Sequence, residues 1–433
     1  MSKNFPTPER DTVQPPKLTS AFHRFWAGAM ASNLADGVML TVIPMIAAAM
    51  TNDPLAVAGL TAARYAPWLL FGLFAGVLVD RVNRVRAMVM ANLMRSGAVV
   101  ALAVFVAMGG SEIAVLYAVM FFVMSCEIVY DISGRSVLPV IARGSLDRAN
   151  GRLVGGREVV QEFIGSPLGG FLFVVAAALP LAVNAGAYVL GALILLGLPL
   201  AAQRPAVAPK ADSPGTVRSV FTQIGEGLQT IWTDPPLRVL VVFGAVINLG
   251  AGAVAAVFVL IVQNHFGVPE ALFGVFLAVA AVGAIGGAAL ASRAAAKVGR
   301  FWTITGGFFA QAVFCALFAF APNPIVAAVA WALVAGASTL GGVLSAGILQ
   351  LTVPEHLMGR VMSAKMMLSM GLLPVGALLG GMLGRLDLRF PALFGTVIFT
   401  VATLLALRSL RAMSARADSA ERAAREAAVG EEV

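Results

Sequence analysis

Two charged residues lie deep inside long apolar stretches, where they can bind and move protons. Asp36 lies near the middle of the first stretch, and Arg64 lies within the second. An ionisable residue at the centre of a membrane helix costs about 2.5–3.5 kcal/mol, so each one needs a partner or a water-filled cavity. A carboxylate paired with an arginine stays ionised, whereas one that loses its partner in an apolar site takes up a proton readily. We therefore expect Asp36 and Arg64 to form either a proton switch or a static ion pair that fixes helix packing.

Three more polar residues are candidates for the same membrane-embedded cavity. Arg95, in the third apolar stretch, is either a further member of the charged network or a contact for an anionic substrate. Asn33 lies about one helical turn before Asp36. Glu127 is the most deeply placed charged residue of the fourth stretch, so we expect it to act both in the cavity and in a gate.

The composition is that of a membrane protein. The chain is 59% hydrophobic and 12% charged over 433 residues, and its mean hydropathy is +0.88. A soluble domain of this length needs far more polar surface. A membrane-spanning helix needs about 20 apolar residues, and the chain holds about twelve such stretches. We expect an all-α integral membrane protein with spans at 22–50, 54–79, 85–108, 113–136, 158–178, 180–202, 237–264, 269–292, 301–321, 324–350, 361–384 and 390–408.

The spans divide into two halves around the longest break in the apolar pattern. The predicted parts are an N-terminal segment (1–21), a first six-helix bundle (22–202), a linker (203–236), a second six-helix bundle (237–408) and a tail (409–433). The halves carry a weak repeat, because Asn33-Leu34-Ala35-Asp36-Gly37 is matched by Asn248-Leu249-Gly250-Ala251-Gly252. We therefore expect two pseudo-symmetric bundles, with Asn248 in the place of Asn33. Since Ala251 replaces the carboxylate, proton chemistry is expected in the first half.

The linker and the tail have their own patterns. In the linker, apolar residues between Val217 and Trp232 fall at helical spacing, which indicates an amphipathic helix on the inner membrane face. The tail is rich in Ala, Arg and Glu and is expected to be a solvated, partly helical appendage.

Basic residues indicate the orientation in the membrane. With an even number of spans both termini share one side, and that side collects most of the Lys and Arg residues of the loops; the exceptions are Arg385 and Arg389. Cytoplasmic loops carry such an excess, so both termini are predicted to be cytoplasmic in a multi-pass protein of the cell membrane. The net charge of +8 is therefore a topology signal and not an indication of nucleic-acid binding.

A charged hinge follows the second span. It reads Gly72-x-x-x-Gly76-x-x-x-Asp80-Arg81-x-x-Arg84-x-Arg86, with glycines spaced so that another helix can approach closely. The segment resembles the signature loop between the second and third spans of major facilitator superfamily (MFS) transporters, with Asn83 where that signature has Gly. The segment 225–238 resembles the central-loop signature of the enterobactin-exporter-like, multidrug efflux branch. The resemblance implies the MFS fold and a transport function.

The same resemblance implies an ion-paired gate at the cytoplasmic side. Glu127, Asp131 and Arg135 are spaced by four and so share one face of the fourth span. The other expected members are Gly72, Gly76, Asp80, Arg81, Arg84, Arg86, Arg157, Glu158, Glu162 and Lys365. Their ion pairs are expected to close the cytoplasmic side in the outward-facing state. Binding of substrate is the alternative role.

The fifth span carries a pointer to direction. Gly165-Ser166-Pro167-Leu168-Gly169-Gly170 resembles the Gly-Pro-x-x-Gly-Gly element of proton-coupled exporters, with Ser166 where that element has Pro. A helix with these residues bends and packs tightly. The resemblance implies export, and plain packing glycines are the alternative.

The substrate is indicated mainly by what the spans lack. Uncharged polar groups are few there while Phe and Met are abundant, which suits an amphiphilic or drug-like compound or a siderophore rather than a sugar. No pattern resembles a nucleotide-binding loop, a metal site or a catalytic triad, so we expect neither enzyme activity nor a cofactor or metal.

The predicted function is proton-coupled export by a monomeric secondary transporter. Its expected partners are the amphiphilic substrate, protons and membrane lipid, with no nucleic acid. Two alternatives remain: a lysophospholipid or lipid translocator without proton coupling, and a non-transporting membrane sensor or scaffold.

Overall fold

The protein consists of membrane-length helices. The computed structural model describes residues 18–79, 82–142, 145–199 and 217–431, and every regular element in these ranges is a helix. Eleven described segments are long and apolar enough to cross a membrane. The helix α2 (Pro54–Val79), whose single charged residue is Arg64, brings the number to the expected twelve. The predicted all-α membrane fold is confirmed.

The first half follows the predicted spans closely. Its elements are α1 (Ser20–Met50), α2, α3 (Arg84–Ala107), α4 (Ile113–Ile141), α5 (Leu146–Glu158), the π-helical η1 (Val159–Gly165), α6 (Ser166–Val175) and α7 (Leu179–Leu196). Side chains begin two of these helices, because Thr19 accepts a hydrogen bond from Phe22 N and Asn83 accepts one from Arg86 N. Asn83, which departs from the MFS signature, thus serves as the N-cap of α3.

The second half repeats this pattern after the linker. Its elements are α9 (Val217–Thr233), α10 (Pro235–Leu260), the π-helical η2 (Ile261–His265), α11 (Glu270–Val298), α12 (Arg300–Ala319), α13 (Pro324–Thr352), α14 (Glu355–Gly384) and α15 (Phe390–Glu431). The two bundles use equivalent packing pairs. The pair α2–α4 corresponds to α11–α13, α3–α7 to α12–α15, and α1–α7 to α10–α15. This agreement supports the expected pseudo-symmetry.

The fifth span begins earlier than predicted. Helical structure runs from Leu146 to Val175 through α5, η1 and α6, whereas the sequence pattern predicts 158–178. Polar residues such as Arg157 and Glu158 interrupt the apolar pattern in α5. A helix that lines a polar cavity keeps such residues inside the membrane, so hydropathy underestimates its length.

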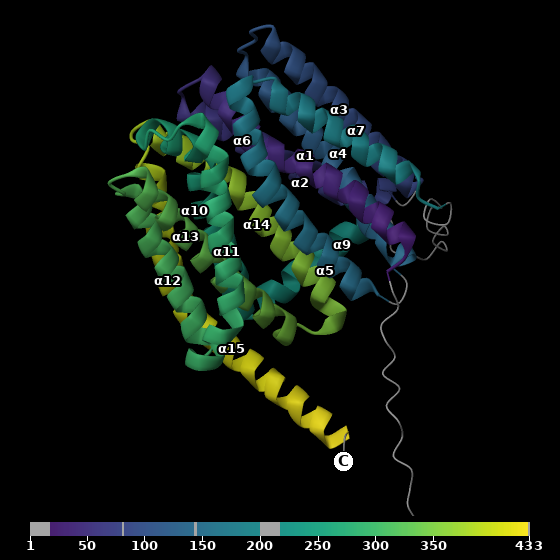
Figure 1. Ribbon diagram of the computed structural model, residues 1–433. Helices are drawn as coiled ribbons and strands as arrows, with labels where there is room; N and C mark the ends of the chain where they lie inside the picture. The colour runs from purple at the N-terminus through teal and green to yellow at the C-terminus, as the bar shows by residue number, and fades with distance from the viewer. Residues whose placement is uncertain (1–17, 80–81, 143–144, 200–216, 432–433) are drawn as a thin grey trace, which may run out of the picture.

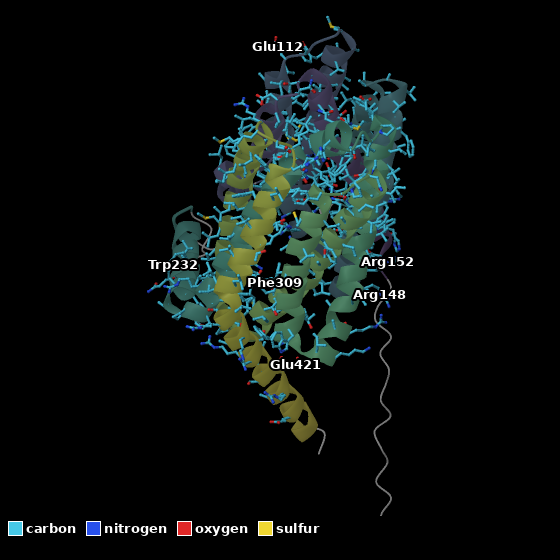
Figure 2. The ribbon with its side chains drawn as sticks, turned by 90° about the vertical axis from the view of Figure 1, so that its left-hand side faces the viewer. Glu112, Arg148, Arg152, Trp232, Phe309 and Glu421 are labelled. Atoms are coloured by element: carbon cyan, nitrogen blue, oxygen red, sulfur yellow. The ribbon has the colours of Figure 1, made fainter. Side chains whose placement is uncertain are left out.

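Side-chain contacts define the two ends of the molecule. Thr19 Oγ1 donates to Ile141 O at 2.8 Å, and Arg24 Nη1 donates to Gly197 O at 2.9 Å, so the start of α1 lies beside the ends of α4 and α7. We call this the linker end and the opposite one the far end. Figure 2 shows Arg148, Arg152 and Glu421 gathered at the linker end and Glu112 at the far end.

The two halves meet mainly toward the far end on one side of the molecule. There α6, the far-end part of the fifth span, packs against α11 (Figure 1). The linker-end part of the same span, α5, packs only within the first half, as far as the described contacts show. On the other side α2 packs against α14. The halves therefore separate from the far end toward the linker end between α5 and α11.

The linker helix and the tail both belong to the second half. Glu226 on α9 pairs with Arg360 on α14 at 2.7 Å, which agrees with the predicted amphipathic helix at this end. The helix α15 continues without a break into the tail, where Met413 and Ala417 are buried and Arg416 pairs with Asp234 at 2.6 Å. The tail is helical as predicted, but its first part is packed rather than solvated.

Candidate functional site

The buried ion pair of the first half joins α1 to α3 and α7. Asp36 accepts a hydrogen bond from Tyr188 Oη at 2.6 Å and lies 3.3 Å from Arg95 Nη1. The Arg95 side chain is fully buried, whereas that of Asp36 is 11% exposed. Asp36 is therefore the member of the pair that a proton or substrate can reach.

Arg95 has partners besides Asp36. Its Nη2 donates to Asn92 Oδ1 at 2.5 Å, and Asn92 Nδ2 in turn donates to Ser32 Oγ at 2.9 Å. Its guanidinium carbon lies 4.4 Å from the ring centroid of Tyr188 and 4.8 Å from that of Tyr130. Both distances are within the range of cation–π attraction. The buried positive charge is thus held from several directions.

The predicted pairing of Asp36 with Arg64 is wrong. Although α1 and α2 are consecutive, they share little surface, because α2 packs against α4 and α14 instead. Arg64 lies half-buried on α2 with its guanidinium carbon 5.7 Å from the Tyr65 ring centroid. The sequence-based alternative that Arg95 belongs to the charged network is the arrangement that the structure contains.

A polar cavity lies next to this ion pair within the first half. Its volume is about 390 Å³, and its polar lining comes from Asn33, Tyr130, Asp131, Arg135 and Arg157, together with Asn150. Apolar lining comes from Phe25, Met88 and Leu138, among others. Tyr130 both lines the cavity and covers the guanidinium of Arg95, so it separates the two by the thickness of one aromatic ring.

Glu127 connects the ion pair with the cavity. It lies on α4 one turn from Asp131, and it interacts electrostatically with both Asp36 and Asp131. The positive charges of Arg95 and Arg64 act on it as well. The residues predicted for proton coupling and those predicted for the gate thus form one charged region rather than two.

The predicted gate is not ion-paired in this conformation. Asp131, Arg135, Glu158, Glu162 and Lys365 form no ion pair within 4.0 Å in the described part of the chain, and Arg84 Nη1 instead donates to Ser136 O within the first half at 2.9 Å. Arg86 is exposed on α3. Gly72 and Gly76 lie in α2, while Asp80 and Arg81 fall outside the described residues. The gate remains a prediction for a state in which the linker end closes.

The far end is closed by an ion pair that the sequence did not single out. Arg385 Nε lies 2.6 Å from Asp53 Oδ1, and Arg385 Nη2 lies 2.5 Å from Asp53 Oδ2, so the guanidinium spans both carboxylate oxygens. Asp53 precedes α2 and Arg385 follows α14, so the pair joins the two halves. Hydrogen bonding from Arg385 holds the pKa of Asp53 below its ordinary value of 3.8.

Glycines provide the close helix contacts beside this ion pair. A Cβ added to Gly170 would lie 3.2 Å from Gly274 N, and one added to Gly274 would collide with Ser166 O and lie 2.7 Å from Pro167 Cα. On the other side, a Cβ on Gly381 would lie 2.7 Å from Ala58 Cβ. These are contacts of α6 with α11 and of α14 with α2. Gly170 of the predicted export element therefore packs in the far-end contact between the halves.

The remaining glycines of that element pack within the first half. A Cβ on Gly165 would lie 2.8 Å from Gly37 Cα, and one on Gly169 would lie 3.0 Å from Val38 O. The fifth span therefore lies against the backbone of α1 around Asp36. Pro167 stands at the start of α6, where its missing amide removes no hydrogen bond that the preceding π-helical turn needs.

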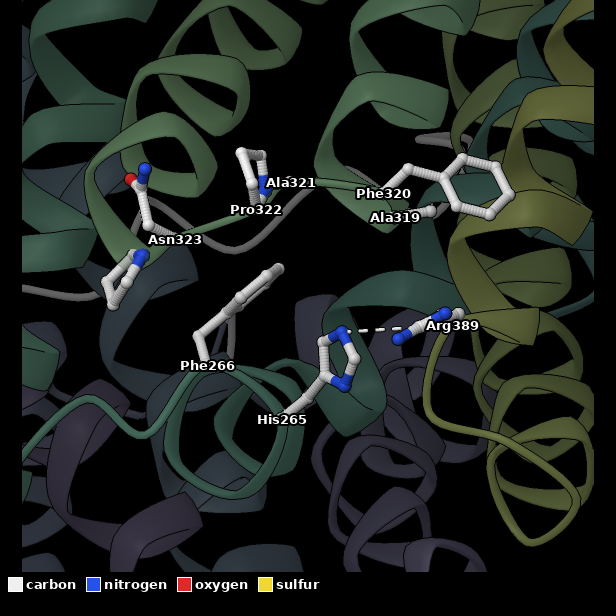
Figure 3. A pocket seen from close by; sticks show the side chains of 9 residues that line it. His265, Phe266, Ala319, Phe320, Ala321, Pro322, Asn323 and Arg389 are labelled. Atoms are coloured by element: carbon white, nitrogen blue, oxygen red, sulfur yellow. Dashed lines mark hydrogen bonds between the residues drawn. The ribbon is translucent and has the colours of Figure 1, made fainter.

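A second, smaller group of polar residues lies at the far end of the second half. Arg389 Nε lies 3.3 Å from His265 Nε2, beside a cavity of about 370 Å³ that Phe266 and Asn323 also line (Figure 3). Asn248, predicted for the central cavity, is half-buried on α10 and is absent from the lining of the polar cavity. The described residues contain no group of three His, Cys, Asp or Glu side chains able to hold a metal ion.

The sequence pattern failed to identify three of the residues described above. Tyr130 carries no charge, and its importance comes only from the ring that it places over Arg95. Asp53 precedes a helix and resembles an ordinary cap, since it also accepts a hydrogen bond from Leu55 N at 3.1 Å. Arg385 did carry a signal, because it is a basic residue on the side that has almost none.

Two helical bundles with a buried charged site define a secondary transporter architecture. The family model described as transmembrane secretion effector matches residues 12–433. The chain therefore belongs to this family of the major facilitator superfamily. A comparison with curated proteins gives no significant match.

Solved structures share the fold at low sequence identity. A bacterial homologue of the iron transporter ferroportin in an inward-facing state is 16% identical, with a TM-score of 0.72 over 91% of this chain and 100% of that one. A point mutant of the nucleoside transporter NupG is 10% identical, with a TM-score of 0.71 over 91% and 100%. A bacterial homologue of the human lysosomal transporter Spinster, inward-facing and occupied, is 15% identical, with a TM-score of 0.65 over 93% and 96%.

Proposed function

We propose that this protein is a proton-coupled exporter of small amphiphilic compounds that works by alternating access. The observation that carries the proposal is the asymmetric burial of the Arg95–Asp36 pair. The arginine is fully enclosed, while its carboxylate partner keeps an 11% exposed side chain. A proton can therefore reach Asp36 while Arg95 stays in place.

Arg95 can tolerate loss of the carboxylate charge better than an isolated buried cation can. When Asp36 is protonated, Arg95 retains Asn92 Oδ1 and the faces of Tyr130 and Tyr188. Breaking a buried ion pair is costly chiefly because it leaves an uncompensated charge. These additional partners lower that cost and make the pair a reversible switch.

The cavity supports an amphiphilic substrate with a polar or charged group. Asp131 and Glu127 bring negative charge and Arg135 and Arg157 bring positive charge, while Phe25, Met88 and Leu138 offer apolar surface. A small number of polar groups in an otherwise apolar wall is typical of sites for compounds of this kind. A substrate that enters this cavity contacts Tyr130 and so perturbs the packing around Arg95.

The proposed orientation places the linker end in the cytoplasm of the cell membrane. The basic residues of the chain gather at this end, which follows the excess of Lys and Arg in cytoplasmic loops. The far-end contacts then close the outside, and the molecule faces inward. One proton returning through a membrane potential of about 100 mV supplies roughly 2.3 kcal/mol, enough for about a fortyfold gradient.

The test is transport in proteoliposomes with an imposed pH gradient and a panel of labelled amphiphiles, siderophores and lysophospholipids. Asp36→Asn is expected to abolish uphill movement while downhill exchange continues, because the amide resembles the protonated acid. Asp53→Asn is the matched control, since it makes the same chemical change outside the bundle. Proton-driven accumulation that survives in Asp36→Asn rules out Asp36 as the coupling residue. Lysophospholipid movement that ignores the pH gradient would assign the protein to lipid translocation instead.

A further inference from the structure

An apolar groove lies on the second half, away from the polar cavity. It runs between α11 and α12 over a floor formed by α13, and its volume is about 620 Å³. The groove exists because α11 and α12 each pack extensively on α13 but share little surface with each other. Its lining is apolar and includes Leu290 (54% exposed) and Val298 (58% exposed). In a chain that spans a membrane, such an exposed apolar lining faces lipid.

Glycines make the groove deep. Gly283 and Gly287 allow α11 to lie directly on the backbone of α13, at Ala332 and Gly336. Gly286 on α11 and Gly306 on α12 have a different role, because a Cβ added at either position meets no heavy atom within 4 Å. Both residues line the groove and are exposed. Open space therefore lies above them, and it extends along the direction of the helices.

Positive charge and an indole ring stand at the linker end of the groove. Lys297 lies seven residues after Leu290, which places it on the same face of α11, and it directly precedes Val298. It is exposed and forms no ion pair in the described part of the chain, whereas nearby Arg300 is engaged by Glu421 at 2.9 Å. Trp302, which lines the groove, is 69% exposed. Tryptophan favours the interface between membrane and water, and lysine there attracts anionic lipid headgroups.

We propose that this groove is a binding site for an anionic phospholipid. One acyl chain lies along Gly286 and Gly306, and the phosphate lies at Lys297 beside Trp302. The volume suits a hydrocarbon chain and is too small for a helix of a second copy, which is about 10–12 Å across. The site lies on α11, whose Gly274 forms the far-end contact with α6, so the bound lipid supports a helix that takes part in closing the transporter.

The test is native mass spectrometry of the full chain with phosphatidylglycerol or phosphatidylcholine as the probe. The double variant Gly286→Leu/Gly306→Leu fills the groove without meeting neighbouring atoms at Cβ. Its control is Gly186→Leu on α7, an exposed helical glycine whose added Cβ also meets nothing within 4 Å. Filling the groove is expected to remove one tightly bound phosphatidylglycerol, and the control is expected to keep it.

Charge provides a second, independent arm of the test. Lys297→Gln is expected to weaken phosphatidylglycerol binding about fivefold, as loss of one interfacial cation does, and to leave phosphatidylcholine unchanged. Arg411→Gln, which removes an exposed cation from α15, is the control. The proposal fails if the filled groove retains the lipid, or if Lys297→Gln behaves like Arg411→Gln. A dimer that disappears on filling would assign the groove to a second copy and would also overturn it.

Discussion

Arg385 of the second half grips both carboxylate oxygens of Asp53 of the first half, at 2.6 Å from Oδ1 and 2.5 Å from Oδ2. Among the ion pairs of the described residues, this one alone joins the two bundles. The structure thus contains a latch at the end opposite to the one for which the sequence predicts ion pairs. An alternating-access cycle needs closing contacts at both ends, so the two sets belong to different states.

Asp53→Asn is expected to loosen the far end and shift the population toward the state open there. The shift should be modest, within a few fold, because ion pairs with exposed partners contribute little. Labelling of a cysteine placed at the far end, or distances between spin labels on the two halves, would report it. Glu112→Gln, an exposed acid at the same end, should leave the population unchanged. The reversed pair Asp53→Arg/Arg385→Asp should restore closure, and a reversed pair that behaves like the single variant would contradict the latch.

The latch should be insensitive to pH across the physiological range. Hydrogen bonding from Arg385 lowers the pKa of Asp53 from 3.8 in the closed state, so the stabilisation is fully present above that value and is lost as the pH falls through the lowered pKa. The difference between wild type and Asp53→Asn should therefore stay constant from about pH 5 to pH 8. A difference that fades near neutral pH would show that other titrating groups control this end.

Gly274→Ala should oppose closure of the far end more strongly. Its new methyl group would collide with Ser166 O on α6, and backbone atoms cannot move aside as a flexible side chain can. Overpacking of this kind costs about 1–3 kcal/mol, which is tenfold or more in a conformational equilibrium. Far-end accessibility should rise while the protein remains folded. Gly186→Ala, which meets nothing within 4 Å, is the control, and equal accessibility in the two variants would refute the assignment.

Arg95→Met should destabilise the first half, because it leaves Asp36 without its cation in a largely apolar site. Loss of one partner of a buried pair costs about 3–5 kcal/mol. Adding Asp36→Leu should recover much of the melting temperature, since an apolar pair avoids the uncompensated charge. The double variant should nevertheless lack proton-driven transport. If the double variant melts lower than Arg95→Met alone, the two side chains do not stabilise each other in the way the geometry indicates.

Truncation after Arg411 should lower thermal stability without abolishing transport. It removes the buried Met413 and Ala417 and deprives Arg300 of its partners Asp418 and Glu421. The polar cavity is lined by the first half, so its residues are untouched. Transport assays and melting curves on the same preparation separate the two effects. Normal stability with lost function would instead favour the sensor or scaffold hypothesis, in which the tail acts on a partner.

The spans were predictable because each membrane-crossing segment has to satisfy a local rule of length and apolarity. The fifth span shows where that rule fails, since Arg157 lines a cavity rather than facing lipid. The partner of Asp36 was not predictable in the same way. Adjacency in sequence favoured Arg64, but α2 packs on α4 and α14, and a helix distant in sequence supplies Arg95 instead.

Contacts between the halves were the hardest to predict. Asp53 and Arg385 are more than 300 residues apart and lie in short loops, where no periodicity links them. Gly170 and Gly274 carry no chemistry of their own, and their role follows from the backbone that each allows to approach. The resemblance of the fifth span to an exporter element identified the right residues, while their position between the bundles required the structure.

The contacts of Gly170 with Gly274 and of Gly381 with Ala58 form an equivalent pair, related by the approximate twofold symmetry of the bundles. A rigid rotation of one bundle against the other separates both contacts in the same movement. Opening at this end is therefore concerted, with no stable form in which one seam has parted and the other holds. A carrier built in this way has no lateral leak during the transition, because protons and small ions find either both seams shut or the whole passage open.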